Sequence, residues 1–117
     1  EYLEVRLTGE EESIRVGGAV LEGAHPRVVR IGEYHVDILP RGDLVLLRNR
    51  DVPGVIGRVG TALAAAGINI GQYNVARLEA GGQALAAIGV DARLRAEHMD
   101  TLRALPEVTA VRQVELD

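Results

Sequence analysis

The chain has 117 residues and a formal net charge of −4, so it is long enough for one ordinary domain or two very small ones. Basic and acidic residues are interspersed and Phe and Trp are absent, which argues against a nucleic-acid-binding surface and a polybasic membrane surface. The absence of Cys excludes a disulfide scaffold and Cys-ligated metal or redox sites. No apolar stretch is long enough to cross a membrane, and we expect a cytoplasmic protein.

The first 38 residues show the period-2 alternation of β-strands four times. The alternating apolar residues are Leu3/Val5/Leu7, Ile14/Val16, Val29/Ile31 and Tyr34/Val36/Ile38. Turns rich in glycine and charge separate them, so this half is predicted to form an antiparallel β meander.

A meander of this size is too small to be stable alone, and we expect it to pack on a part of the protein that lies upstream. The chain opens inside an apparent strand, so we also expect that it is cut from a longer protein. Pro40 to Gly42 mark a boundary that divides the chain into residues 1–42 and 43–117.

Residues 44–70 predict a strand, a tight turn, a helix and a second strand. The apolar run Leu44 to Leu47 is typical of a buried strand, and the turn from Asp51 to Gly54 offers a capping carboxylate and, in Pro53, a residue suited to a first helical turn. The helix is predicted to end at Gly67, and the next strand to start at Ile68. Its apolar stripe is Ile56, Val59, Leu63 and Ala66.

The remaining residues complete the pattern. A hairpin turn at 79–82 precedes an aliphatic strand at 83–90, and a second helix with one apolar face stops before Pro106. That face comprises Leu94, Met99, Leu102 and Leu105. The last strand, 108–116, changes parity midway, which indicates a bulge.

Residues 43–117 therefore predict an α+β fold of the ferredoxin-like βαββαβ type, with a four-stranded antiparallel sheet and two helices on one face. Right-handed crossovers place the first and third strands in the centre and the second and fourth at the edges. An open edge invites pairing with a second copy, so a homodimer is expected.

The turn before the first helix, which contains Pro53, can bind charged groups. Unpaired N–H groups of Gly54, Val55 and Ile56 at the positive end of the helix suit a carboxylate, and Asp51 suits an ammonium group. Asn69, which opens the next strand, would add a carboxamide from a second chain. Together they fit an α-amino acid. The alternative is that Asp51 only caps the helix and Asn69 only forms a turn.

Other candidate sites are weaker. The three histidines lie on separate elements without the spacing of metal ligands, so no metal site is predicted; they are His25, His35 and His98. Glycines at threefold spacing in the first helix indicate close helix packing rather than a phosphate loop; they are Gly54, Gly57 and Gly60. Arg27 and Arg30 form either a second, small anion site or ordinary solvated strand charge.

The segment RNRDVPGVIGRVGTALAAAGINI, followed by GGQALAAIGVD, resembles the ACT domain at the C-terminus of D-3-phosphoglycerate dehydrogenases. The preceding stretch GGAVLEGAHPRVVRIGEYHVDILPRGDLVLLRNRD resembles the end of the intervening, allosteric-substrate-binding segment in the longer forms of that enzyme. The resemblance covers nearly the whole chain. It implies a regulatory module of serine biosynthesis that binds L-serine as feedback inhibitor between two ACT domains of a homodimer, within a tetrameric enzyme.

The effector contacts of that family correspond here to Asn49, Asp51 and, from a second chain, Asn69. Serine-sensitive members have His or Tyr at the position of Asn49. Arg27 is the nearest match to a basic residue of the second effector site. The catalytic groups and the NAD-binding fold would lie upstream, so this chain is expected to bind no cofactor and to catalyse nothing. An assembly module without ligand, or the ACT region of a serine dehydratase β chain, are the alternatives.

Overall fold

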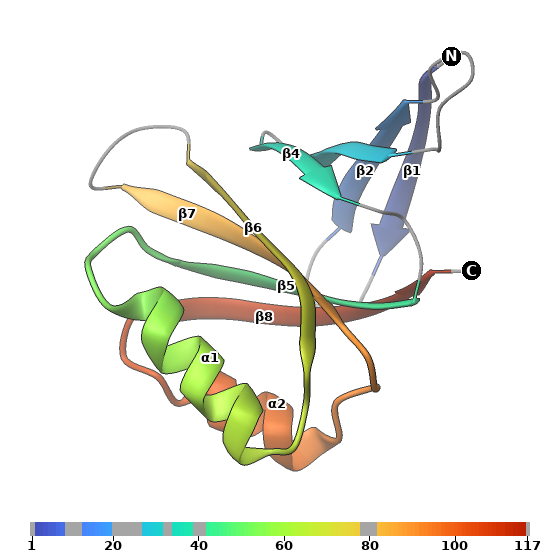
Figure 1. The fold of residues 1–117 in the computed structure, drawn as a ribbon. Coiled ribbons are helices and arrows are strands. Elements are labelled where there is room, and N and C mark those ends of the chain that lie inside the picture. Colours follow the sequence, from blue (N-terminus) through green and yellow to red (C-terminus); the bar gives the residue numbers. More distant parts are fainter. Residues whose placement is uncertain are drawn as a thin grey trace.

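The computed structural model describes residues 2–8, 13–19, 27–31, 34–38, 42–77 and 82–116, and of these the side chains of residues 31 to 115. These residues form two antiparallel sheets (Figure 1). The first sheet confirms the predicted meander, because its four strands follow one another in sequence order. They are β1 (Tyr2–Thr8), β2 (Ser13–Ala19), β3 (Arg27–Ile31) and β4 (Tyr34–Ile38).

The second sheet has the order β6-β7-β5-β8 and carries two helices. Its strands are β5 (Gly42–Arg50), β6 (Ile70–Arg77), β7 (Gln83–Val90) and β8 (Val108–Leu116), and its helices are α1 (Val55–Ala65) and α2 (Ala96–Arg103). The sequence β5-α1-β6-β7-α2-β8 is the predicted ferredoxin-like arrangement. The predicted central strands, β5 and β7, and edge strands, β6 and β8, are confirmed as well.

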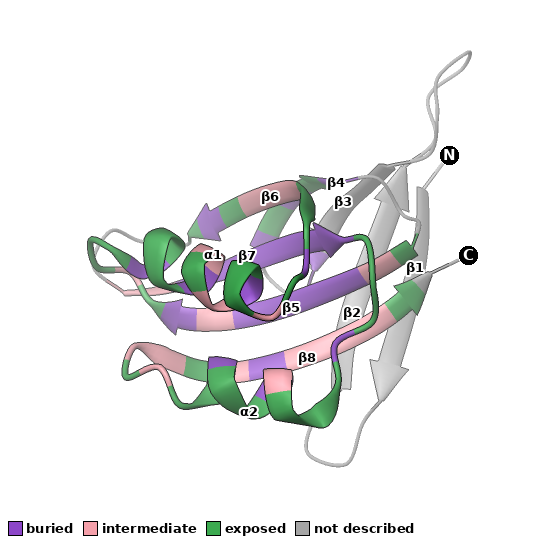
Figure 2. Cartoon of the chain, turned by 60° about the horizontal axis from the view of Figure 1, so that its bottom comes forward, coloured by how far each residue is buried: buried purple, intermediate pink, exposed green. Residues whose placement is uncertain are grey.

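Both helices cover the same face of this sheet (Figure 2). Alternate residues of the central strands point toward them, because successive side chains of a strand face opposite sides. The buried residues of this core include Val45, Leu47, Ile88, Val59, Leu63, Met99 and Leu102. None of the helices in the described part of the chain is long and apolar enough to span a membrane.

The other face of the second sheet packs against the meander. Leu44, Leu46, Leu85 and Ala87 form a second core with Ile31, Tyr34, Val36 and Ile38, and β4 contacts β6 and β7. Strands β5 and β7 are therefore buried on both faces, which explains their continuous apolar runs. Within this chain the second half supports the meander through β4. The expected packing on an upstream part stays a prediction.

The start of α1 differs from the prediction. Its N-cap is Gly54, at φ 91°, with no side-chain cap, so Asp51 does not cap the helix. The buried stripe begins at Val55 and not at Ile56, whose side chain is 59% exposed. The helix ends as predicted, with Gly67 in the left-handed region at φ 76°. Strand β6 begins at Ile70, two residues later than expected.

Two further details concern single residues. A Cβ atom added to Gly57 or Gly60 would meet no atom within 4 Å, so the interpretation of these glycines as sites of close helix packing is wrong. The predicted bulge is confirmed, because Thr109 is inserted between two register pairs of β5 and β8. Its hydroxyl donates to the carbonyl oxygen of Arg48 over 3.2 Å.

Candidate functional site

A pocket of about 470 Å³ lies between the first turn of α1 and the ends of β6 and β7, within the range of small-molecule sites. Residues 49 and 51–57 form one wall. The floor consists of alternate residues of the two strands, which are Tyr73, Val75 and Arg77 of β6 and Ala84 and Ala86 of β7. Because the two alanines carry only methyl groups, the sheet surface is low here and leaves room below the helix.

The turn at Gly54 presents free backbone donors to this pocket. The N–H groups of Asp51 and Val52 donate to Gly82 and Arg50 carbonyl oxygens over 2.8 and 2.9 Å. In a helix that begins at Val55, however, the first N–H groups have no carbonyl acceptor within the helix. They lie at the positive end of the helix dipole, so this wall can bind a carboxylate.

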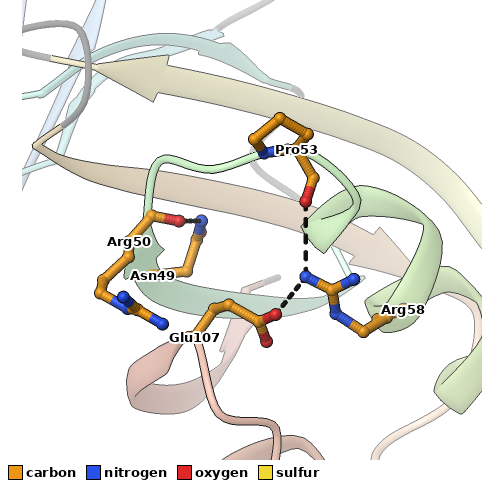
Figure 3. A network of polar contacts seen from close by, with 5 residues as sticks. All are labelled: Asn49, Arg50, Pro53, Arg58 and Glu107. Atoms are coloured by element: carbon orange, nitrogen blue, oxygen red, sulfur yellow. Dashed lines mark hydrogen bonds and ion pairs between the residues drawn. The ribbon is translucent and has the colours of Figure 1, made fainter.

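Asn49 is the one buried polar side chain among the described residues, with 6% exposure. Its Nδ2 donates to the carbonyl oxygen of Arg50 over 2.7 Å (Figure 3). This hydrogen bond fixes the carboxamide at the pocket wall. The carboxamide oxygen is then the group that can accept a hydrogen bond from a ligand.

Asp51 forms an ion pair across the pocket rim with Arg77, whose Nε lies 3.2 Å from Oδ2. The side chain of Asp51 is 15% exposed and that of Arg77 is 58% exposed. Sequence reasoning missed Arg77, together with Tyr73 and Val75. The available signal was the period of the strand, because residues 73, 75 and 77 share one face.

Tyr73 gives the floor a polar group. Burial disfavours the charged phenolate and raises the pKa of Tyr73 above its ordinary value of 10.0. The hydroxyl therefore stays protonated at neutral pH and can donate a hydrogen bond as well as accept one.

Arg58 holds the turn in place. Its Nη2 lies 3.5 Å from the carbonyl oxygen of Pro53 and forms an ion pair with Glu107 (Figure 3). The backbone oxygen of Glu107 accepts from the N–H of Arg50 over 2.8 Å. Glu107 thus holds the start of the turn directly at Arg50 and its end at Pro53 through Arg58.

The ACT domain family matches residues 44–107, which is more than half of the chain and includes both the helices and the pocket wall. The chain belongs to this family. The match begins within β5 and ends in the loop before β8, and the pocket lies at the junction of the first strand and the first helix of the ACT domain.

Curated relatives agree with this assignment over more than the ACT domain. D-3-phosphoglycerate dehydrogenase of Bacillus subtilis is 32% identical over 97% of this chain, and that of Methanocaldococcus jannaschii is 28% identical over 96%. In both cases the chain spans 22% of the relative's length. A probable L-serine dehydratase β chain of Bacillus subtilis is 24% identical over 94% of this chain and 50% of its own.

Six of the seven residues predicted for the effector site of the ACT domain line the pocket: Asn49, Asp51, Pro53, Gly54, Val55 and Ile56. Asn69 does not. It is exposed, and its backbone N–H donates to Asp91 Oδ1 over 3.2 Å. Asn69 is not among the residues that line the pocket of its own chain, and its contribution from a second chain stays a prediction.

The second anion site lies on the meander that precedes the ACT domain. Arg27 and Arg30 are both on β3, and Arg30 is in register with His35 of β4. Their side chains fall outside the described ones. This site also stays a prediction.

Proposed function

We propose that this ACT domain is the regulatory module of a D-3-phosphoglycerate dehydrogenase and that its pocket binds L-serine or a similar small amino acid. The observation that carries the proposal is the pocket itself, where a helix N-terminus and the carboxylate of Asp51 lie in the same wall. A zwitterion has one charge for each of these groups.

The binding mode follows from the charges of the wall. The carboxylate of the amino acid accepts from the free N–H groups of Val55 and Ile56, as anions do at helix N-termini. Its ammonium group donates to the carboxylate of Asp51 and to the carboxamide oxygen of Asn49. Asn49 stands where the resemblance implies His or Tyr in serine-sensitive members, and its shorter carboxamide leaves more of the pocket for the ligand side chain.

A second copy of the chain completes the site in this proposal. Of the four exposed large hydrophobic side chains among the described residues, three border the pocket, namely Val52, Ile56 and Val75. Strand β6 is an edge strand, and an antiparallel β6–β6 contact would cover these side chains. The same contact places the start of one β6 opposite the end of the other. Asn69 of one chain would then lie beside the Arg77 end of its partner's pocket.

Regulation requires that the effector bind one arrangement of the enzyme more tightly than another. A ligand held between two ACT domains has this property, because it binds the paired arrangement and not the separated one. The NAD-dependent catalytic part and the tetramer belong to the longer protein of which this chain would be one fifth.

Calorimetric titration of the chain with L-serine tests the proposal. We expect saturable heat at millimolar ligand or below, and its loss in Asp51→Asn. In Asn69→Ala we expect weaker binding with unchanged thermal unfolding of the free chain. Absence of heat and of any thermal shift at millimolar L-serine would refute the proposal that this pocket binds L-serine.

A second candidate is an assembly module that binds nothing. The ion pair of Asp51 with Arg77 favours it, because the carboxylate is already satisfied in the free chain. Sedimentation distinguishes the two functions. An assembly module gives a dimer whose stability is unaffected by L-serine, whereas a ligand shared between chains shifts the equilibrium toward the dimer.

A further inference from the structure

We propose that Arg77 is a specificity-determining residue of the pocket, which selects ligands that carry a carboxylate beside the ammonium group. On binding, the guanidinium leaves Asp51 and becomes a further partner of the ligand's carboxylate, beside the N–H groups of Val55 and Ile56, while the ligand's ammonium replaces it at Asp51. The inference rests on the effector site proposed above and restricts it to zwitterions.

The placement of Arg77 supports this role. It extends from the pocket floor, where it is in register with Ala84, and crosses the rim to reach Asp51 in the opposite wall. The closest approach to Asp51 is through Nε. A guanidinium carries five N–H donors in a planar fork, so the same group can bind a carboxylate that enters the pocket beneath it.

The exposed fractions of the two side chains determine how the Arg77–Asp51 ion pair opens. Arg77 is 58% exposed, and an ion pair with such a partner contributes little to stability. Separating Arg77 from Asp51 therefore costs little free energy. Asp51 is only 15% exposed, and a largely buried carboxylate requires a replacement for the lost partner. The ammonium group of a ligand provides that replacement.

The charge balance then separates two classes of ligand. A simple amine would exchange one ion pair for another and would leave the cationic Arg77 beside a second cation. An amino acid returns a partner to each group, because its carboxylate accepts from the released guanidinium. The rim carries one negative and one positive charge, and it is complementary to a ligand that also carries one of each.

The test compares L-serine with serinol, in which a hydroxymethyl group replaces the carboxylate. Both are titrated by calorimetry into the 117-residue chain, into Arg77→Gln and into a control, Arg93→Gln. Arg93 is 61% exposed and forms an ion pair with Glu115 over 3.7 Å, so the control removes the same charge from a similarly exposed arginine whose partner is itself exposed. Neither Arg93 nor Glu115 lines the pocket.

We expect Arg77→Gln to weaken L-serine binding by about tenfold, as is typical of a lost hydrogen bond to a charged group, and to leave serinol binding equal or stronger. Arg93→Gln should bind L-serine as the parent chain does. Arg77→Lys, which keeps the charge but not the fork, should retain part of the preference for L-serine over serinol.

Two results would overturn the inference, and they differ from each other. If Arg77→Gln binds L-serine as tightly as the parent chain or more tightly, Arg77 is only a competitor for Asp51, and the effector site itself stands. If the parent chain binds neither L-serine nor serinol, the effector site is refuted and the selectivity with it. Circular dichroism melts of the variants establish that each is folded.

Discussion

Substituting alanine for Gly54 should destabilise the ACT domain through the turn that lines the pocket. The backbone at Gly54 has φ 91°, and a residue with a Cβ pays about 1–2 kcal/mol in the left-handed region. The new Cβ would also lie 2.7 Å from Nη1 of Arg58, so the guanidinium must move. That movement weakens its bond to Pro53 and its ion pair with Glu107, at a cost of about 1 kcal/mol for a half-exposed pair.

The expected loss is therefore about 2–3 kcal/mol of unfolding free energy, which lowers a urea midpoint by roughly 1 M. A double-mutant cycle with Arg58→Ala separates the two causes. In the Arg58→Ala background, Gly54→Ala should cost only the free energy of placing alanine in the left-handed region. Equal costs in both backgrounds, or a total below about 0.5 kcal/mol, would refute the assignment of Arg58 as the group that the turn must accommodate.

Three further predictions concern the core, the proposed interface and pH. Leu63→Ala should cost about 2–5 kcal/mol in urea unfolding because Leu63 is 1% exposed, whereas Ile56→Ala should cost less than about 1 kcal/mol; similar losses would contradict the observed helix face. Val75→Lys should turn a sedimenting dimer into monomer without lowering the monomer's stability, and an unchanged dimer would exclude the β6 edge. Because the pKa of Tyr73 is raised in the folded chain, its phenol keeps its proton at a pH where the same phenol in the unfolded chain loses it. The unfolding free energy should therefore fall as the pH rises above about 10. Tyr73→Phe should reduce this fall in urea titrations at pH 9 and 10.5.

The elements of this fold were predictable because its apolar patterns are simple. Strands β5 and β7 show uninterrupted aliphatic runs, and the meander alternates cleanly, so both the sheets and the strand order follow from the sequence. The partner of the meander was not predictable. A period-2 pattern states that one face is buried, but it does not state which surface buries it.

The site was predictable where its residues are contiguous. Asn49 to Ile56 belong to one strand-to-helix turn, and local chemistry identified them. Only the first residue of the helix stripe was wrong, Ile56 in place of Val55, because the N-cap at Gly54 depends on a backbone angle that residue types do not report. Arg77 was missed for a different reason. Its position opposite Asp51 depends on the register of β6 against β7.

The double-sided burial of the central strands has a practical consequence for anyone who wishes to study the effector site in isolation. A chain cut near residue 42 would keep every side chain of the pocket but would uncover Leu44, Leu46, Leu85 and Ala87 together. Such a contiguous apolar surface promotes self-association that is independent of the ligand. Measurements of dimerisation or effector affinity are therefore best made with the meander attached.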